Sequence, residues 1–239
     1  MRAVLFDVDG TLVKLGGAGR EALARGVAAR LGRPLEEVLA AAMEVDFRGR
    51  TDTILLEELA GRLGHRVPEL DPPLVAAYLA ALPGTVARSR AEGRYETMPG
   101  ALELVASLEA RDDVLVGLLT GNVREAARIK LGPVGLAHLA DRPGGFGDDA
   151  RERADVARAA IRRLAAAGVP AGRVLVVGDT EHDVSAAHAA GARAVAVATG
   201  WTDPAVLRSC GADLFLPDLR DPAPLLALLE SPGTPGPAD

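Results

Sequence analysis

The residues with the clearest capacity for chemistry stand near the start of the chain, at Asp7 and Asp9. They follow the apolar run 3–6 and precede Gly10 and Thr11. A near-continuous apolar run is typical of a parallel strand that is buried on both faces. Two carboxylates at its end are costly to bury unless a cation compensates them. We therefore expect both at the carboxyl end of a strand, where such sheets place their ligands, with one attacking a phosphate.

A second acidic pair, Asp179 and Asp183, follows the apolar run 174–177. Their i, i+4 spacing places both on one face of a helix that starts here. With Asp7 and Asp9 they supply hard oxygen ligands, which suit Mg²⁺ better than zinc or copper. Residues of this type also cap helices, but four carboxylates at two strand ends exceed what caps require. The sequence predicts a Mg²⁺ site formed from these four residues.

A third polar cluster, Thr120-Gly121-Asn122, ends another apolar run and leads into a predicted helix. Its hydroxyl and amide groups and the first N–H groups of the helix point the same way, which is an arrangement that binds phosphate oxygens. Thr and Asn are also common helix caps, so the cluster alone decides little. We predict that Gly121 and Asn122 bind substrate, together with Gly10 and Thr11.

The elements that must position these groups alternate between strand and helix after residue 98. Apolar runs predict strands over 114–119, 174–177, 194–197 and 213–216, with helices over about 123–131, 149–167 and 181–190. Such alternation predicts βαβ units, a parallel sheet and right-handed crossovers.

The segment between the first strand and this region has no alternating β-branched run and is predicted to be all-helical. Leu23, Val27 and Leu31 form one apolar helical stripe, and further helices are expected over about 34–45, 52–63 and 72–92. The predicted fold is α/β, a doubly wound parallel sheet with an inserted helical cap that overhangs the site as a lid. The predicted core is 1–14 and 96–230, the cap is 15–95, and 231–239 is a Pro- and Gly-rich disordered tail.

Composition narrows the class of partner. The net charge of −6 and the 3% aromatic content argue against nucleic acid, which needs clustered basic and stacking side chains. A single cysteine excludes an internal disulfide. No apolar stretch reaches the ~20 residues of a membrane span, and Asp7 and Asp9 interrupt any signal-peptide core. We expect a cytoplasmic protein, monomeric or homodimeric, whose partner is a small phosphorylated metabolite.

These motifs resemble those of a known family. Asp7-Val8-Asp9-Gly10-Thr11, the threonine after the second apolar strand, and the segment 178–183 are similar to the signature motifs of the haloacid dehalogenase-like (HAD) hydrolase superfamily. The resemblance covers about residues 1–15 and 95–225 and implies a Rossmann-like core. The helical insertion is similar to the cap of phosphoglycolate-phosphatase-like members.

The resemblance implies a role for each matching residue. Asp7 is the nucleophile that forms an aspartyl-phosphate, which divides one difficult displacement into two easier ones. Asp9 protonates the leaving alcohol and then deprotonates water. Thr120 hydrogen-bonds the transferred phosphoryl group. Asp7, the carbonyl of Asp9 and Asp179 coordinate Mg²⁺, with Asp183 either a direct ligand or a residue behind the ligands.

The chain departs from the family in one respect. Family members place a lysine between the second and fourth motifs to bind nucleophile and phosphate, and here the only lysine in that interval is Lys130. Arg151 and Arg153 lie at a better sequence position, and an arginine fork can bridge phosphate and carboxylate. We favour Arg153 as the catalytic cation, with Lys130 and Arg151 as the alternatives.

Within the cap, Arg48 and Arg50 form a basic turn that precedes Thr51 and Asp52. Such a turn in a lid is able to meet the substrate's non-phosphate end, for instance a carboxylate, through bidentate arginine. An equally weighted interpretation is a plain loop whose Thr51 or Asp52 caps the next helix.

The function expected from all this is a Mg²⁺-dependent phosphatase that hydrolyses a small, phosphoglycolate-like phosphate monoester through an aspartyl-phosphate. The alternatives are a phosphatase for a nucleotide, sugar phosphate or pyrophosphate, or a phosphomutase using the same two aspartates. A phosphate-sensing protein of the receiver type is the rival from another class. It is disfavoured because receivers lack an acid at i+2 and need no lid.

Overall fold

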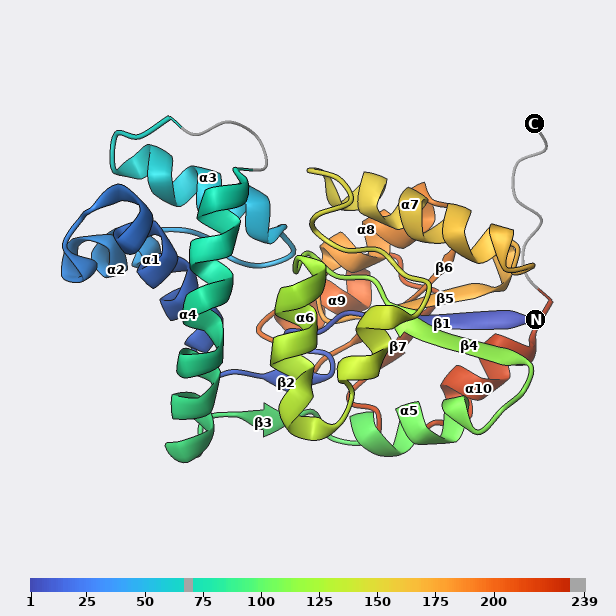
Figure 1. Ribbon diagram of the computed structural model, residues 1–239. Helices are drawn as coiled ribbons and strands as arrows, with labels where there is room; N and C mark the ends of the chain where they lie inside the picture. Colours follow the sequence, from blue (N-terminus) through green and yellow to red (C-terminus); the bar gives the residue numbers. More distant parts are fainter. Residues whose placement is uncertain (67–70, 233–239) are drawn as a thin grey trace.

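The computed structural model describes residues 1–66 and 71–232, and Figure 1 shows a sheet flanked by helices, with a second group of helices beside it. The sheet consists of β1 (Arg2–Phe6), β4 (Val114–Leu118), β5 (Val174–Gly178), β6 (Arg193–Val197) and β7 (Leu214–Leu216). Its order is β4-β1-β5-β6-β7, and every neighbouring pair is parallel. The strand that carries the first acidic motif therefore lies between the two strands that carry the other motifs.

Helices cover both faces of this sheet. Successive residues of β1 point to opposite faces, and Ala3, Val4, Leu5 and Phe6 are all buried. Val4 and Phe6 share a core with α5 (Ala101–Glu109), α6 (Arg124–Leu131) and α10 (Ala223–Glu230). Ala3 and Leu5 share one with α7 (Arg153–Ala166), α8 (Glu181–Ala189) and α9 (Pro204–Ser209). The predicted doubly wound parallel α/β sheet is confirmed (Figure 1).

The cap helices leave and rejoin the sheet domain through a short ribbon. They are α1 (Ala18–Leu31), α2 (Leu35–Met43), α3 (Asp52–Arg62) and α4 (Pro72–Ala91). The ribbon pairs β2 (Val13–Lys14) with β3 (Glu96–Thr97) in antiparallel fashion. The predicted boundaries at residues 14 and 96 fall in this ribbon, whose strands are too short to leave a periodic signal. The division into core and cap stays a prediction.

Elsewhere the elements differ from the expected ones at their ends. The helix expected to start near 149 begins at Arg153, because Asp149 closes a turn in which its carboxylate accepts the Phe146 N–H at 2.9 Å. Short 3-10 helices, η1 (Gly132–Val134), η2 (Ala137–Asp141) and η3 (Ala171–Arg173), fill connections. In the described part of the chain, no helix is long and apolar enough to cross a membrane. The predicted disordered tail falls almost entirely outside the described residues.

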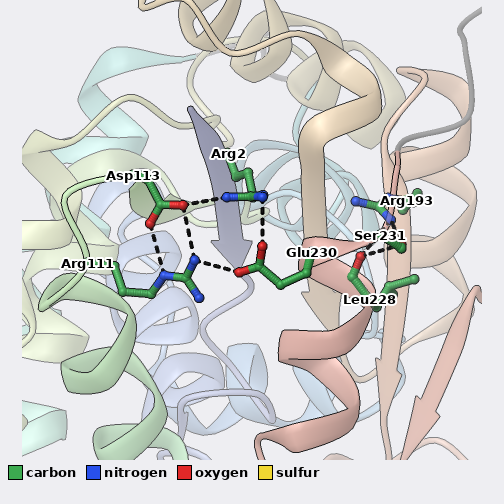
Figure 2. Close-up of polar contacts among 7 residues, drawn as sticks. All are labelled: Arg2, Arg111, Asp113, Arg193, Leu228, Glu230 and Ser231. Carbon is green, nitrogen blue, oxygen red and sulfur yellow. Dashed lines mark hydrogen bonds and ion pairs between the residues drawn. The ribbon is translucent and has the colours of Figure 1, made fainter.

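The end of the sheet away from the cap is held by an ion-pair network (Figure 2). Arg2 of β1 pairs with Asp113 and, at 2.7 Å, with Glu230 of α10, while Arg111 bonds the same two acids. The network fastens the last helix to the start of the first strand. Because its members are partly exposed, each pair adds little to stability.

The cap is built on the crossing of α1 and α4, where the backbones approach closely. A Cβ on Gly26 of α1 would lie 2.6 Å from the Tyr78 nitrogen of α4. Leu23 and Val27, which flank this glycine, are buried as the predicted stripe requires. The position tolerates no side chain unless the helices separate.

This crossing predicts opposite effects for one substitution at two helical glycines. Gly26→Ala is expected to destabilise by about 1–3 kcal/mol, because the methyl group overpacks the helix contact. Gly61→Ala in α3, where an added Cβ meets nothing within 4 Å, is expected to stabilise by up to about 1 kcal/mol. The midpoint of urea denaturation measures both. Equal shifts at the two positions would contradict the close-packed crossing.

Candidate active site

A pocket of about 640 Å³ lies between the carboxyl ends of the strands and the cap. Its core wall includes the strand-end residues Asp7, Asp9, Thr120 and Asp179. Residues from separate strands meet here because parallel strands end at the same edge of the sheet. The predicted residues Gly121, Asn122, Lys130, Arg153, Arg48 and Arg50 also line the pocket.

Asp7 stands directly after β1 and faces a buried arginine. Nη2 of Arg153, at the start of α7, lies 3.0 Å from Oδ1 of Asp7 and also pairs with Oδ1 of Asp183. The Arg153 side chain is only 9% exposed, so both pairs are largely desolvated. The structure thus places the favoured cation, Arg153, against the predicted nucleophile.

Asp183 performs two further tasks in the same cluster. It follows Thr180, the residue that caps α8, and its Oδ2 accepts from the Thr180 N–H at 3.1 Å and from the Thr180 hydroxyl at 2.7 Å. This reciprocal arrangement is a capping box that satisfies the first N–H groups of the helix. Asp183 therefore caps the helix through Oδ2 and also belongs to the acidic cluster, where its Oδ1 pairs with Arg153.

The cluster carries more negative charge than its arginine balances. Ligand oxygens of Asp7, Asp179 and Asp183 lie within 4.8 Å of one another. Burial, opposed by Arg153 and aided by neighbouring carboxylates, raises the pKa of Asp7 to about 6. Burial and the charges of Asp183 and Asp7 likewise raise the pKa of Asp179 well above its usual value. A hard divalent cation fits this set, because it would offset the surplus charge with oxygen ligands only.

Asp179 is held by backbone that leaves no room for side chains. A Cβ on Gly10 would lie 2.5 Å from an Asp179 oxygen, and one on Gly200 would lie 1.6 Å away. The Thr11 hydroxyl donates to Asp179 at 3.4 Å, and the Thr199 hydroxyl donates to the Gly10 carbonyl at 2.6 Å. Gly10 and Thr11 thus contact or border this carboxylate, and their expected role in binding substrate stays a prediction.

Asp9 has its own pair of donors on the other side of the pocket. Its Oδ2 accepts from Nδ2 of Asn122 at 2.8 Å and from Nζ of Lys130 at 2.6 Å. Asn122 also donates to the Thr120 hydroxyl at 2.8 Å, which ties the second motif to the first. The two predicted cations therefore serve different acids: Arg153 contacts Asp7, and Lys130 contacts Asp9.

Lys130 extends this network toward Asp52 of the cap, which the sequence indicated only as a possible helix cap. Its side chain is 5% exposed. Burial lowers its pKa, but the charges of Asp9 and of Asp52 outweigh burial and hold the pKa above its usual value. Burial in turn raises the pKa of Asp52 to about 6 against the opposing charge of Lys130. The Tyr78 hydroxyl beside it has no hydrogen-bond partner of standard geometry within residues 1–66 and 71–232, and burial raises its pKa well above the usual value.

Asp52 docks the cap onto the segment 121–123, at the end of the tripeptide that we predict to bind phosphate. Its N–H donates to the Gly121 carbonyl at 2.8 Å, and its Oδ2 accepts from the Val123 N–H at 3.0 Å. Thr51 caps α3 and donates to the Arg151 carbonyl at 3.1 Å. The sequence indicated only that Thr51 or Asp52 caps a helix. A Thr-Asp pair at the start of a helix looks the same in sequence whether its side chains cap that helix or contact another domain.

The basic turn lines the pocket, but its arginines already have partners. Arg48 forms a fork with Asp46, at 3.0 Å and 2.9 Å, and this hydrogen bonding lowers the pKa of Asp46 to about 2. Arg50 pairs with Glu58 and donates to the Asp46 carbonyl. Both guanidinium groups are therefore largely neutralised by carboxylates of the cap itself.

The fold and the pocket together define a cap-covered α/β enzyme with a buried acidic centre. A sequence model of the haloacid dehalogenase-like hydrolases matches residues 1–191. The chain is 32% identical over 203 residues to a phosphoglycolate phosphatase of Rhodospirillum rubrum. The matched region covers 84% of this chain and 81% of that protein.

Solved structures share the fold at lower identity. A hydrolase from Pseudomonas syringae superposes with a TM-score of 0.68 at 22% identity, over 97% of this chain and all of that one. CbbY from Rhodobacter sphaeroides, solved in complex with phosphate, gives a TM-score of 0.63 at 22% identity, over 93% and 96% of the two chains.

The chain belongs to the haloacid dehalogenase-like hydrolase family. The resemblance drawn from the motifs is thereby confirmed, and so is the expected class of enzyme, a phosphatase. The comparisons assign no individual residue a role, so the roles predicted for Asp7, Asp9 and the other pocket residues stay predictions.

The docking contact of Asp52 generates a stability prediction. Asp52→Ala is expected to destabilise by about 2–4 kcal/mol, because the buried Val123 N–H and the Lys130 ammonium lose a partner. Glu57→Ala in the same helix removes only the more exposed pair with Arg151 and is expected to cost under about 1 kcal/mol. Urea denaturation measures both. A cost at Asp52 no larger than that at Glu57 would show that the buried contact does not hold the cap.

Proposed function

We propose that this enzyme hydrolyses a small phosphate monoester in a Mg²⁺-dependent reaction that passes through an aspartyl-phosphate on Asp7. The observation that carries the proposal is the contact of Arg153 with Asp7 on the pocket wall, beside a separately held second acid, Asp9. One carboxylate is thus placed to attack and the other to move protons. The phosphoglycolate phosphatase relative supports hydrolysis of a small phosphate monoester.

In the first half-reaction, an oxygen of Asp7 forms a bond to phosphorus and the bond from phosphorus to the alcohol oxygen breaks. Asp9 gives its proton to the departing alkoxide. Arg153 bonds Oδ1 of Asp7, which fixes the orientation of the carboxylate and reserves its other oxygen for attack. Thr120 and Gly121 line the pocket beside Asp7 and hold the transferred phosphoryl oxygens.

In the second half-reaction, water attacks phosphorus and Asp9 takes the proton that the water loses. The bond between phosphorus and the Asp7 oxygen breaks, which regenerates the carboxylate and releases phosphate. Asn122 and Lys130 bond Oδ2 of Asp9 and hold the group in place through both steps. Asp9 thus loses a proton in the first half-reaction and regains one in the second, so each turnover returns it to its starting state.

Asp7, Asp179 and the carbonyl of Asp9 would hold Mg²⁺, with Asp183 bound to Arg153 behind them. When bound, the ion neutralises charge on the phosphoryl group and the carboxylates, which is the main requirement of phosphoryl transfer. The chain's own contribution is to keep these oxygens converged before the ion arrives. Asp179 is held in place by close packing against the backbone at Gly10 and Gly200.

Phosphoglycolate is the substrate that the relative's activity suggests, and a small phosphorylated metabolite is the partner class. A cytoplasmic location and a monomeric or homodimeric state stay predictions from the sequence.

Replacing the nucleophile tests the proposal directly. Asp7→Asn is expected to lower Mg²⁺-dependent hydrolysis of p-nitrophenyl phosphate on the order of 10³-fold or more, because an amide cannot form the phosphoenzyme. Asp155→Asn, at an exposed position of α7, is the matched control with unchanged turnover. EDTA should abolish wild-type activity and Mg²⁺ should restore it. A wild-type protein that retains a stable aspartyl-phosphate without turnover would instead be a phosphate sensor.

Substitutions of the two buried cations, Arg153 and Lys130, test which of them positions the nucleophile. Arg153→Ala should remove most turnover, on the order of 10²-fold or more, because Asp7 loses its positioning contact, and Arg153→Lys should restore part of it. Far-ultraviolet circular dichroism confirms that each variant is folded, and kcat with p-nitrophenyl phosphate is the measurement. If Arg153→Ala turns over at the wild-type rate while Lys130→Met does not, Lys130 and not Arg153 is the catalytic cation.

A further inference from the structure

One arginine of the cap lines the pocket but forms no ion pair within the described part of the chain. Arg20, in the first turn of α1, lines the pocket together with the basic turn. Unlike Arg48 and Arg50, it has no carboxylate within ion-pair distance anywhere in residues 1–66 and 71–232. Its Nη1 contacts only the sulfur of Met43, at 3.7 Å.

Arg20 is nevertheless held in a fixed orientation. Its guanidinium stacks over the ring of Phe47 at 4.5 Å from the centroid, and Phe47 also lines the pocket. Stacking occupies one face of the planar group and leaves its N–H edge for an in-plane acceptor. The Nε of Arg20 is buried and has no hydrogen-bond partner among the described residues.

The other basic groups of the pocket are already engaged. Arg153 is bound to Asp7 and Asp183, and Lys130 is bound to Asp9. The scissile phosphate is placed at these core residues, whereas Arg20 reaches the pocket from the cap. Arg20 is therefore available to the end of the substrate that lies away from the phosphate.

We propose that Arg20 binds a second anionic group of the substrate, so that the pocket selects phosphate monoesters that carry a carboxylate or a second phosphate. The assignment rests on the proposed phosphatase function and sharpens its substrate class. It also moves the carboxylate-binding role that the sequence suggested for the basic turn to a residue of α1. Arg20 is a binding residue in this scheme and has no part in the bond-breaking steps.

Three esters built on the same two-carbon unit separate the possibilities: phosphoglycolate, 2-hydroxyethyl phosphate with a neutral end, and ethanediol bisphosphate with a second phosphate. We expect wild-type kcat/KM to be higher for an anionic ester than for the neutral one. Arg20→Met should lower kcat/KM about 10–100-fold for the anionic ester, mainly through KM, and less than about 3-fold for the neutral one. Whichever anionic ester shows the larger loss identifies the group that Arg20 binds.

Arg30→Met, an exposed position of the same helix, is the matched control and should change no ratio. Arg20→Lys should recover part of the selectivity, since charge is kept and the fork is lost. An equal loss for all three esters in Arg20→Met, or no loss for any, would overturn the proposal.

Calorimetric binding of the same esters to the Asp7→Asn protein, with and without Arg20→Met, gives a readout that needs no turnover. Failure of the phosphatase proposal would appear as a wild-type enzyme that hydrolyses none of the esters. Binding still decides the role of Arg20 in that case: a preference for an anionic ester that disappears in Arg20→Met supports it, and affinities that the substitution leaves unchanged overturn it.

Discussion

The structure depends on compensation of buried negative charge at the carboxyl end of β1. Three carboxylates converge within 4.8 Å, and one buried guanidinium, that of Arg153, bridges two of them. Desolvated carboxylates without such partners would take up protons, as the raised pKa of Asp7, about 6, already indicates. The surplus charge is what makes the cluster suited to a divalent cation, and a nucleophilic carboxylate must remain ionised to act.

The same requirement accounts for the division of labour between the two cations. A single lysine placed between nucleophile and phosphate is the pattern of the family, whereas this chain uses Arg153 for Asp7 and Lys130 for Asp9. Nη2 of Arg153 contacts both Asp7 and Asp183, so this arginine also secures Asp183 and thereby the start of α8.

The cap is coupled to the site through backbone as well as side chains. The Asp52 contacts with Gly121 and Val123 join α3 to the loop after β4, which we predict to hold phosphate, so opening the cap would disturb that loop. A Cβ on Gly121 would lie 2.2 Å from the Arg50 carbonyl, which shows how closely the two segments pack. Domain closure and phosphate binding are therefore expected to occur together.

The sequence by itself determined the parallel sheet, the helical insertion and the strand-end positions of Asp7, Asp9, Thr120 and Asp179, because apolar runs and motif spacing are local properties of the chain. Only the tertiary structure decided which charges meet. Lys130 and Asp9 are 121 residues apart. Arg48 and Arg50 pair with cap acids, whereas Arg20 forms no ion pair within the part of the chain that the structure describes. Whether two charged residues pair depends on their distance in space. That distance is set by the packing of the helices and is not encoded in the spacing of the residues along the chain.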